Sequence, residues 1–178
     1  RLVELTKTSS ATYSAYGWNV ITLPGSDPVE EWSAEFHSGS LHRVETPRDR
    51  VTADCKEKTG TYLSLMTGKV LSGPEVAKFA CGINTVKEIL STSLLGRVHS
   101  KFGYAERIQI TDNENIRTYD ISVDGIIVRC IYELNDNSRN AVIKLEVRQI
   151  DRTVDDPNIF DIASLSTSAI PEKFRIAP

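Results

Sequence analysis

The segment from Arg107 to Ile150 constrains the fold of this chain most, because its apolar residues recur at every second position over consecutive stretches. A period of two is typical of β-strands with one buried face, since successive side chains point to opposite sides of a sheet. Short polar turns separate the stretches, among them Asp124-Gly125, a typical hairpin pair. The segment predicts an antiparallel meander of four strands, whose buried residues are Tyr119, Ile121 and Val123, then Ile126, Val128, Cys130, Tyr132 and Leu134, then Ala141, Ile143, Leu145 and Val147.

Further short strands are predicted in the first seventy residues. β-Branched and aromatic side chains are frequent there, and Pro-Gly, Ser-Gly-Ser and Thr-Gly sequences mark turns between them. The alternation predicts six antiparallel strands, near residues 13–23, 32–37, 41–46, 50–56, 62–66 and 69–71.

The period changes to that of a helix after residue 73. Pro74 suits a first helical position and Gly82 suits the end of a short helix. A second helix is expected from Thr85 to Leu95, because Thr85 and Glu88 match a capping box and apolar residues follow at helical spacing. The predicted fold class is therefore α+β, a single antiparallel sheet of about ten strands with two helices inserted in mid-chain.

Length favours one domain over residues 1–178, since two domains would each be smaller than usual. The tail after Asp155 is predicted to be a loop with one helical turn near residues 159–165. A formal net charge of -3, with both signs interspersed, disfavours nucleic acid as a partner. The chain begins at Arg1, as it would after removal of a signal peptide, although a domain cut at its edge would begin in the same way.

The three cysteines leave two interpretations open. Cys55 lies in a predicted strand and Cys81 at the end of a predicted helix, so a bond between them would close a loop of about 27 residues and staple helix to sheet. Cys130 alternates with core residues and is expected to be a buried, unreactive thiol. The alternative is that all three are free thiols in a cytosolic protein.

No arrangement typical of an enzyme is found, and no cofactor is expected. The serine-glycine sequences lack the flanking pattern of a nucleophile elbow. His37, His42 and Glu35 form the one candidate metal site, with two histidines and a carboxylate around a hairpin. With regular pairing, however, His37 and His42 would point to opposite faces of the hairpin, and an exposed strand face explains these polar residues better. No metal is therefore assigned, and the metalloenzyme hypothesis ranks third.

The order of these elements resembles that of the LolA/LolB-like lipoprotein-carrier superfamily. The run Gly39-Ser-Leu-His-Arg-Val-Glu-Thr-Pro47 looks like that family's strand and Pro-ended turn, and Tyr62 to Lys69 looks like its following hairpin. The resemblance spans most of Trp18 to Ile150 and implies a strongly curved sheet, an open half-barrel, with the two helices packed on its concave face. Such carriers hold their lid with a buried arginine, for which Arg43 is the candidate here.

The resemblance implies a non-enzymatic, periplasmic or secreted protein that binds a lipid or other hydrophobic molecule between sheet and helices. The residues expected to line that site are Trp18, Trp32, Phe36, Leu63, Leu65, Phe79, Ile89, Leu90, Ile121 and Val128. The same side chains would form the core of any sheet covered by helices. The alternative is therefore a structural or protein-interaction domain with a filled core and no small-molecule ligand.

Overall fold

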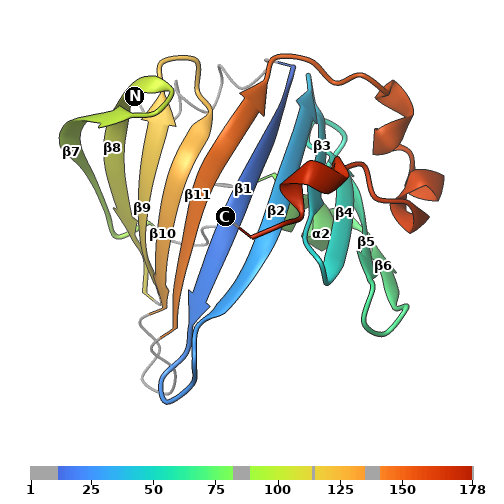
Figure 1. The fold of residues 1–178 in the computed structure, drawn as a ribbon, viewed down its shortest axis with the longest axis horizontal. Coiled ribbons are helices and arrows are strands. Elements are labelled where there is room, and N and C mark those ends of the chain that lie inside the picture. The colour runs from blue at the N-terminus through green and yellow to red at the C-terminus, as the bar shows by residue number, and fades with distance from the viewer. Residues whose placement is uncertain (1–11, 82–88, 114, 135–140, 178) are drawn as a thin grey trace. The chain divides into compact units, whose positions relative to one another are not determined.

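A computed structural model describes residues 12–81, 89–113, 115–134 and 141–177. Eleven strands form one open antiparallel sheet in the order β6-β5-β4-β3-β2-β1-β11-β10-β9-β8-β7 (Figure 1). The strands are β1 (Tyr13–Thr22), β2 (Val29–Ser38), β3 (Leu41–Glu45), β4 (Asp49–Asp54), β5 (Thr59–Ser64), β6 (Val70–Ser72), β7 (Ser91–Ser100), β8 (Gly103–Thr111), β9 (Asn115–Ser122), β10 (Ile127–Leu134) and β11 (Val142–Asp151).

All ten strands predicted from the sequence are present, and β7 is an eleventh. The second predicted helix is wrong in part, because Ser91–Leu95 belongs to β7 and pairs with β8; residues 85–88 lie outside the described residues. A register shift between Leu94 and Gly96 interrupts the alternation in β7. Such a bulge leaves apolar residues at spacings that look helical, and the pairing with β8 overrides that local preference.

The described residues contain one α-helix, α2 (Pro74–Ala80), and three 3-10 turns in the tail, η2 (Pro157–Phe160), η3 (Ile162–Ser166) and η4 (Glu172–Phe174). The prediction of two helices is therefore not met in this part of the chain, and the tail has more helical turns than expected. No described helix is long and apolar enough to cross a membrane. Val123 was predicted to be buried but is 88% exposed, because β9 ends at Ser122 and Val123 lies in the turn.

The chain divides into two compact units. Of the described residues, unit 1 comprises 18–30, 89–113, 115–134 and 141–147, and so contains β7 to β10 and most of β11. Unit 2 comprises 12–17, 31–81 and 148–177, and contains β3 to β6, α2 and the tail. Each unit has its own apolar clusters, described below.

In unit 2 the sheet is covered on both faces. Helix α2 packs on β4 and β5, where Ala77 and Ala80 meet Val51 and Ala53. The tail packs on the opposite face, since Thr52 lies between Val51 and Ala53 and bonds to the tail through the carbonyl of Phe160. Figure 1 shows α2 and the 3-10 turns on either side of these strands.

Gly60 sets how closely α2 approaches β5. A Cβ atom at this position would lie 2.8 Å from the backbone nitrogen of Ala77. We expect Gly60→Ala to lower the free energy of unfolding by about 1 to 3 kcal/mol, because the backbone of α2 must move to admit the methyl group. Urea denaturation measures the change, with Thr59→Ala on the same strand as control. Equal effects of the two substitutions would contradict the close approach.

Candidate functional site

An apolar row crosses unit 1 from one strand to the next. Leu94 of β7 lies opposite Ile108 of β8, which lies opposite Tyr119 of β9, followed by Cys130 of β10 and Leu145 of β11. Directly opposed residues of antiparallel strands share a face, so these five side chains form one continuous line. We call this line the apolar row.

The apolar row changes from buried to exposed along its length. Ile108 and Tyr119 are buried, together with their neighbours Ile110 and Ile121. Burial raises the pKa of the Tyr119 hydroxyl to about 12, which keeps it neutral. Leu94, at the β7 end, is 57% exposed. The row therefore joins an apolar interior to solvent at the last strand of the sheet.

Leu90 lies directly before β7, four positions before Leu94. Its backbone N–H donates to the carbonyl of Thr111, the residue of β8 that pairs with Ser91. Leu90 is also 57% exposed. Isolated exposed leucines are common, but an exposed leucine that continues a buried apolar row, as Leu94 does, suggests a binding surface.

Arg117 of β9 lies on the same face as the apolar row. Arg117 is opposite Ile110 on one side and Tyr132 on the other. Its guanidinium carbon lies 4.9 Å from the centre of the Tyr132 ring, and its Nη2 lies 3.5 Å from Oδ2 of Asp112. Burial would lower the pKa of Arg117, but the surrounding tyrosines and Asp112 outweigh it and raise the pKa. The Arg117 guanidinium is thus held by the Tyr132 ring and the Asp112 carboxylate.

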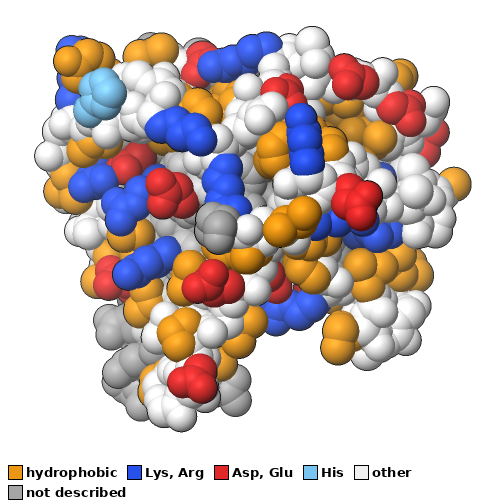
Figure 2. Space-filling model, viewed as in Figure 1, with side chains coloured by type: hydrophobic (Ala, Val, Ile, Leu, Met, Phe, Trp, Pro, Cys, Tyr) orange, Lys and Arg blue, Asp and Glu red, His pale blue; other side chains and the backbone are white. Residues whose placement is uncertain are grey.

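The opposite face of unit 1 is polar. Arg107 binds both carboxylate oxygens of Asp120, at 2.6 and 2.8 Å, and Arg129 approaches the same carboxylate at 3.8 Å. Figure 2 shows acidic and basic side chains interspersed over β7 to β11. Mixed charge of this kind is explained by cross-strand ion pairs on a solvated surface.

In unit 2 a fully buried ion pair holds the tail. Arg43 and Glu45 on β3 are both 0% exposed, and Nε of Arg43 donates to Oε1 of Glu45 at 2.7 Å. Arg43 also donates to the carbonyls of Ile159, Ser164 and Thr167, while Glu45 accepts from Ser168 and from the backbone N–H of Ala169. Burial lowers the pKa of Arg43, and the nearby carboxylate of Glu45 opposes this. Arg43, the candidate lid arginine, thus binds the tail in the described residues.

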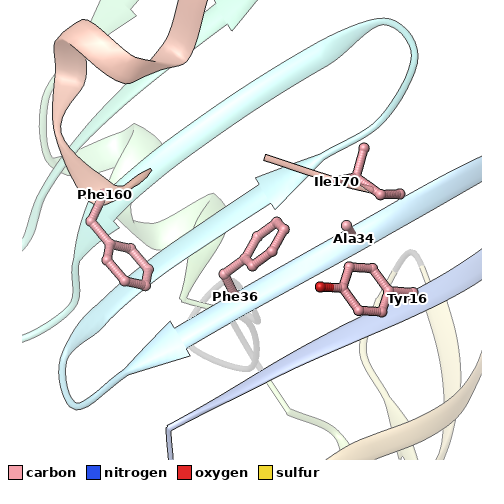
Figure 3. Close-up of a cluster of buried hydrophobic side chains, with 5 residues drawn as sticks. All are labelled: Tyr16, Ala34, Phe36, Phe160 and Ile170. Atoms are coloured by element: carbon pink, nitrogen blue, oxygen red, sulfur yellow. The ribbon is translucent and has the colours of Figure 1, made fainter. Parts of the chain in front are cut away.

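Phe36 lies with this tail rather than in an open space. Figure 3 shows its ring among Tyr16, Ala34, Phe160 and Ile170, all buried. Trp32 packs against the same cluster and is partly buried. Phe36 and Trp32, both predicted to line a ligand site, therefore pack in a core to which the tail contributes Phe160 and Ile170.

A shallow groove runs beside the tail. It has a volume of about 350 Å³, and Phe160 and Ile162 form the wall that the tail supplies. The sheet side includes Leu41 together with the hydroxyl-bearing Thr61 and Ser72, whose oxygens lie 2.9 Å apart. Hydrogen bonding between these hydroxyls leaves a mostly apolar surface.

The prediction that His37 and His42 point to opposite faces of the hairpin is wrong. The two-residue turn at Gly39-Ser40 places them directly opposite each other, with ring centroids 3.9 Å apart. His37 Nε2 lies 3.5 Å from Glu35. Burial would raise the pKa of Glu35, but hydrogen bonding to His37 and its charge outweigh it, and the pKa is lowered. The described residues nevertheless contain no group of three side chains that could hold a metal ion.

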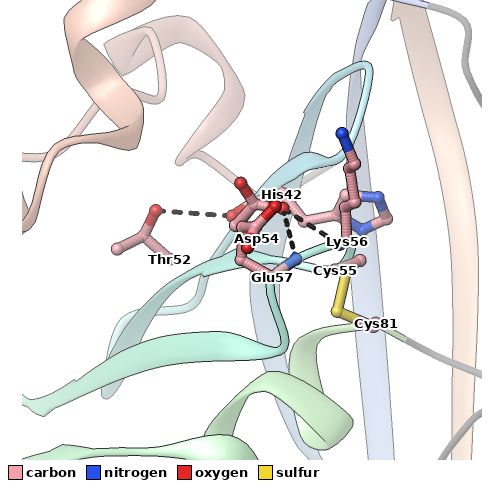
Figure 4. The surroundings of a disulfide bond; sticks show 7 residues. All are labelled: His42, Thr52, Asp54, Cys55, Lys56, Glu57 and Cys81. Carbon is pink, nitrogen blue, oxygen red and sulfur yellow. Dashed lines mark hydrogen bonds between the residues drawn. A yellow bond between two sulfur atoms is a disulfide. The ribbon is translucent and has the colours of Figure 1, made fainter.

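Cys55 and Cys81 form a disulfide, one of the two interpretations that the sequence left open. Cys130 takes no part in a disulfide and is only partly buried, whereas a buried position was predicted. The bond connects the residue after β4 to the residue after α2, as Figure 4 shows. Asp54 accepts hydrogen bonds from the backbone N–H groups of Lys56 and Glu57 and so fixes the turn that carries Cys55. The helix is therefore stapled to the sheet.

The other predicted site residues are dispersed. Leu63 is half-buried on β5, while Leu65, Ile89 and Leu90 are exposed. Phe79 belongs to α2. Trp18 is buried on β1 and donates a hydrogen bond to Glu30, and Ile121 and Val128 are buried on β9 and β10. Leu94 and Ile108 are not among the predicted site residues. Ile108 lies in the first predicted strand of the meander, whose buried positions were not assigned from the sequence.

The sequence matches no family model and no curated protein. Several solved structures are similar. An uncharacterised conserved protein from Thermus thermophilus has a TM-score of 0.59 and 13% identity, covering 99% of this chain and 96% of that one. A LolA superfamily protein from Nitrosomonas europaea has a TM-score of 0.50 and 9% identity, covering 92% and 99%. A DUF1329 family protein from Desulfovibrio piger has a TM-score of 0.50 and 8% identity, covering 92% and 95%.

Proposed function

We propose that this chain, whose fold is LolA/LolB-like, is a non-enzymatic exported carrier that binds a lipid or other hydrophobic molecule along the apolar row of unit 1. The observation that carries the proposal is the continuity of the row from buried Ile108 and Tyr119 to exposed Leu94. Five strands spaced by about 4.8 Å make the row about 19 Å long, which suits an extended acyl chain. The lining residues proposed are Leu90, Leu94, Ile108 and Ile121.

Export is proposed from the disulfide. Bonds such as Cys55–Cys81 form and persist in oxidising compartments and are rare in the cytosol. A periplasmic or secreted location follows from that chemistry, and it agrees with the carrier hypothesis, since lipids need soluble carriers outside the membrane.

A second candidate function is a structural or protein-interaction domain with a filled core. Unit 2 favours it, because α2 fills one face of β4 and β5, and the tail fills the other side of the sheet around Phe36. The two candidates differ in whether unit 1 takes up a small hydrophobic molecule.

Leu94→Asp tests the carrier hypothesis at the exposed end of the row. We expect the substitution to weaken binding of a fluorescent fatty-acid analogue at least tenfold, because a carboxylate would have to lose water against the ligand. The fold should persist, since Leu94 is exposed. Fluorescence titration gives the dissociation constant, and circular dichroism checks the fold.

The matched control is Val123→Asp, an exposed apolar residue in a turn of the same unit. It adds the same charge away from the row and should bind the analogue as the unmodified protein does. Equal binding by the two variants would exclude the row as the site. No binding by the unmodified protein, purified free of lipid, would favour the filled-core alternative.

A further inference from the structure

Strand β6 lies at one end of the described sheet, as Figure 1 shows. The N–H of Gly73, directly after β6, donates to the carbonyl of Gly60. Hydrogen-bonded and non-hydrogen-bonded pairs alternate along antiparallel strands, so the next pair, Ser72 with Thr61, is not bonded through the backbone. The backbone N–H and C=O groups of Ser72, and of Val70 two positions earlier, therefore point away from the sheet.

These outward groups have no backbone partner among the described residues. β5 is the one neighbour of β6 in the described sheet, and all three residues of β6 are exposed, Val70 by 58% and Leu71 by 44%. Charged residues and proline, which often keep an edge strand from pairing, do not occur within β6. The edge therefore offers donors and acceptors to another extended backbone.

The groove beside the tail reaches this edge, because Ser72 of β6 lines it. Thr52, Thr61 and Ser72 lie directly opposite one another on β4, β5 and β6, so they share the face of the sheet that the tail covers. Phe160 and Ile162 of the tail form the facing wall of the groove. The short side chain of Ser72 is thus the last one between the groove and the edge.

A strand added to β6 would place a side chain at the mouth of the groove. Directly opposed residues of neighbouring strands share a face, so the added residue opposite Ser72 would continue the line of Thr52, Thr61 and Ser72. Hydrogen bonds already engage the hydroxyls of that line. Thr61 and Ser72 bond to each other at 2.9 Å, and Thr52 donates to the carbonyl of Phe160 at 2.7 Å. The remaining surface suits an apolar side chain.

We propose that β6 and the adjoining groove bind an extended segment of a partner protein, which pairs with the edge through its backbone and inserts one apolar side chain beside Ser72. Strand addition of this kind draws affinity from main-chain hydrogen bonds and specificity from pockets for alternate side chains. Asp54 also lines the groove, and its carboxylate disfavours an acidic side chain there.

The length of β6 favours a peptide segment over a second copy of the chain. A stable protein–protein interface buries about 1,200 Å² or more, and pairing along a strand of three residues covers far less than that. The site lies wholly in unit 2, so it does not depend on whether unit 1 takes up a hydrophobic ligand.

Selection from a phage-displayed library of random peptides, followed by NMR titration with a selected synthetic peptide, tests this site in the disulfide-bonded protein. The selected peptides should share an apolar residue and lack acidic residues beside it. Binding should shift the amide signals of Val70 and Ser72 and leave those of β8 and β9 unchanged.

Two variants separate the edge from the groove. Val70→Pro removes an outward N–H and should weaken peptide binding about tenfold, while Val70→Ala keeps that N–H and should stay within about threefold of the unmodified protein. Proline is tolerated at an edge position whose N–H faces solvent, so the fold should persist. Ile162→Ser lowers the groove wall and should weaken binding about fivefold. Its control, Ile176→Ser, changes an equally exposed tail residue outside the groove.

Three results would overturn the proposal. They are failure to enrich any peptide, equal affinity of the selected peptide for Val70→Pro and Val70→Ala, and equal affinity for Ile162→Ser and Ile176→Ser. If Val70→Pro does not fold, methylation of each backbone nitrogen of the peptide in turn decides with the unmodified protein. Loss of affinity at every second nitrogen would support strand pairing, and loss without that period would contradict it.

Discussion

Arg43→Leu is expected to lower the free energy of unfolding by about 3 to 5 kcal/mol, the largest effect of any single substitution considered. The guanidinium is fully buried, and its loss leaves the carboxylate of Glu45 buried without its closest cation. Arg50, whose Nε lies 3.7 Å from Glu45, replaces only part of that interaction. The carbonyls of Ser164 and Thr167 lose their donor in the same substitution.

Urea denaturation followed by circular dichroism measures this loss. The matched control is Arg97→Leu, which removes an exposed arginine from β7 and should change stability by less than about 1 kcal/mol. Amide exchange should also show faster opening of residues 159–169 in Arg43→Leu. A stability loss for Arg43→Leu as small as that of the control would mean that the buried network does not hold the tail.

Loss of the disulfide is expected to have the second largest effect. The bond joins residues 26 positions apart, and the loop-closure entropy of such a loop is worth about 3.5 kcal/mol. The double substitution Cys55→Ser and Cys81→Ser, or reduction of the bond, should therefore lower the free energy of unfolding by roughly that amount. Unit 2 should respond first, because both cysteines lie in it.

Urea denaturation with and without reductant measures the effect of the bond. Cys130→Ala is the control, because it removes the cysteine on β10 that takes no part in a disulfide and leaves the Cys55–Cys81 bond intact. Reductant should shift the midpoint of Cys130→Ala as much as that of the unmodified protein. A midpoint that reductant leaves unchanged in both would show that the bond contributes nothing to stability.

Ten of the eleven strands could be predicted, because alternation and turn residues are local signals. The β2–β3 hairpin shows the limit of that approach. Alternation locates both strands, but the faces on which His37 and His42 lie depend on the length of the turn between them. The turn has two residues and places the histidines opposite each other, whereas the sequence alone does not define its length. β7 was missed for a similar reason, since its bulge between Leu94 and Gly96 breaks the period that identifies a strand.

The tail was the least predictable part. Its segments from Pro157 to Phe174 are short 3-10 turns with no apolar period, so nothing local indicates where they pack. Arg43 could be singled out as a candidate buried arginine on a strand. Its partners could not be named, because three of them are backbone carbonyls more than a hundred residues away.

The central claim is that unit 1 carries a hydrophobic ligand, and native mass spectrometry of freshly purified protein tests it most directly. The carrier hypothesis predicts an added mass of one lipid-sized molecule, which organic extraction removes and which Leu94→Asp protein lacks. A single mass equal to that of the bare chain, with no uptake of an added fatty acid, would contradict it.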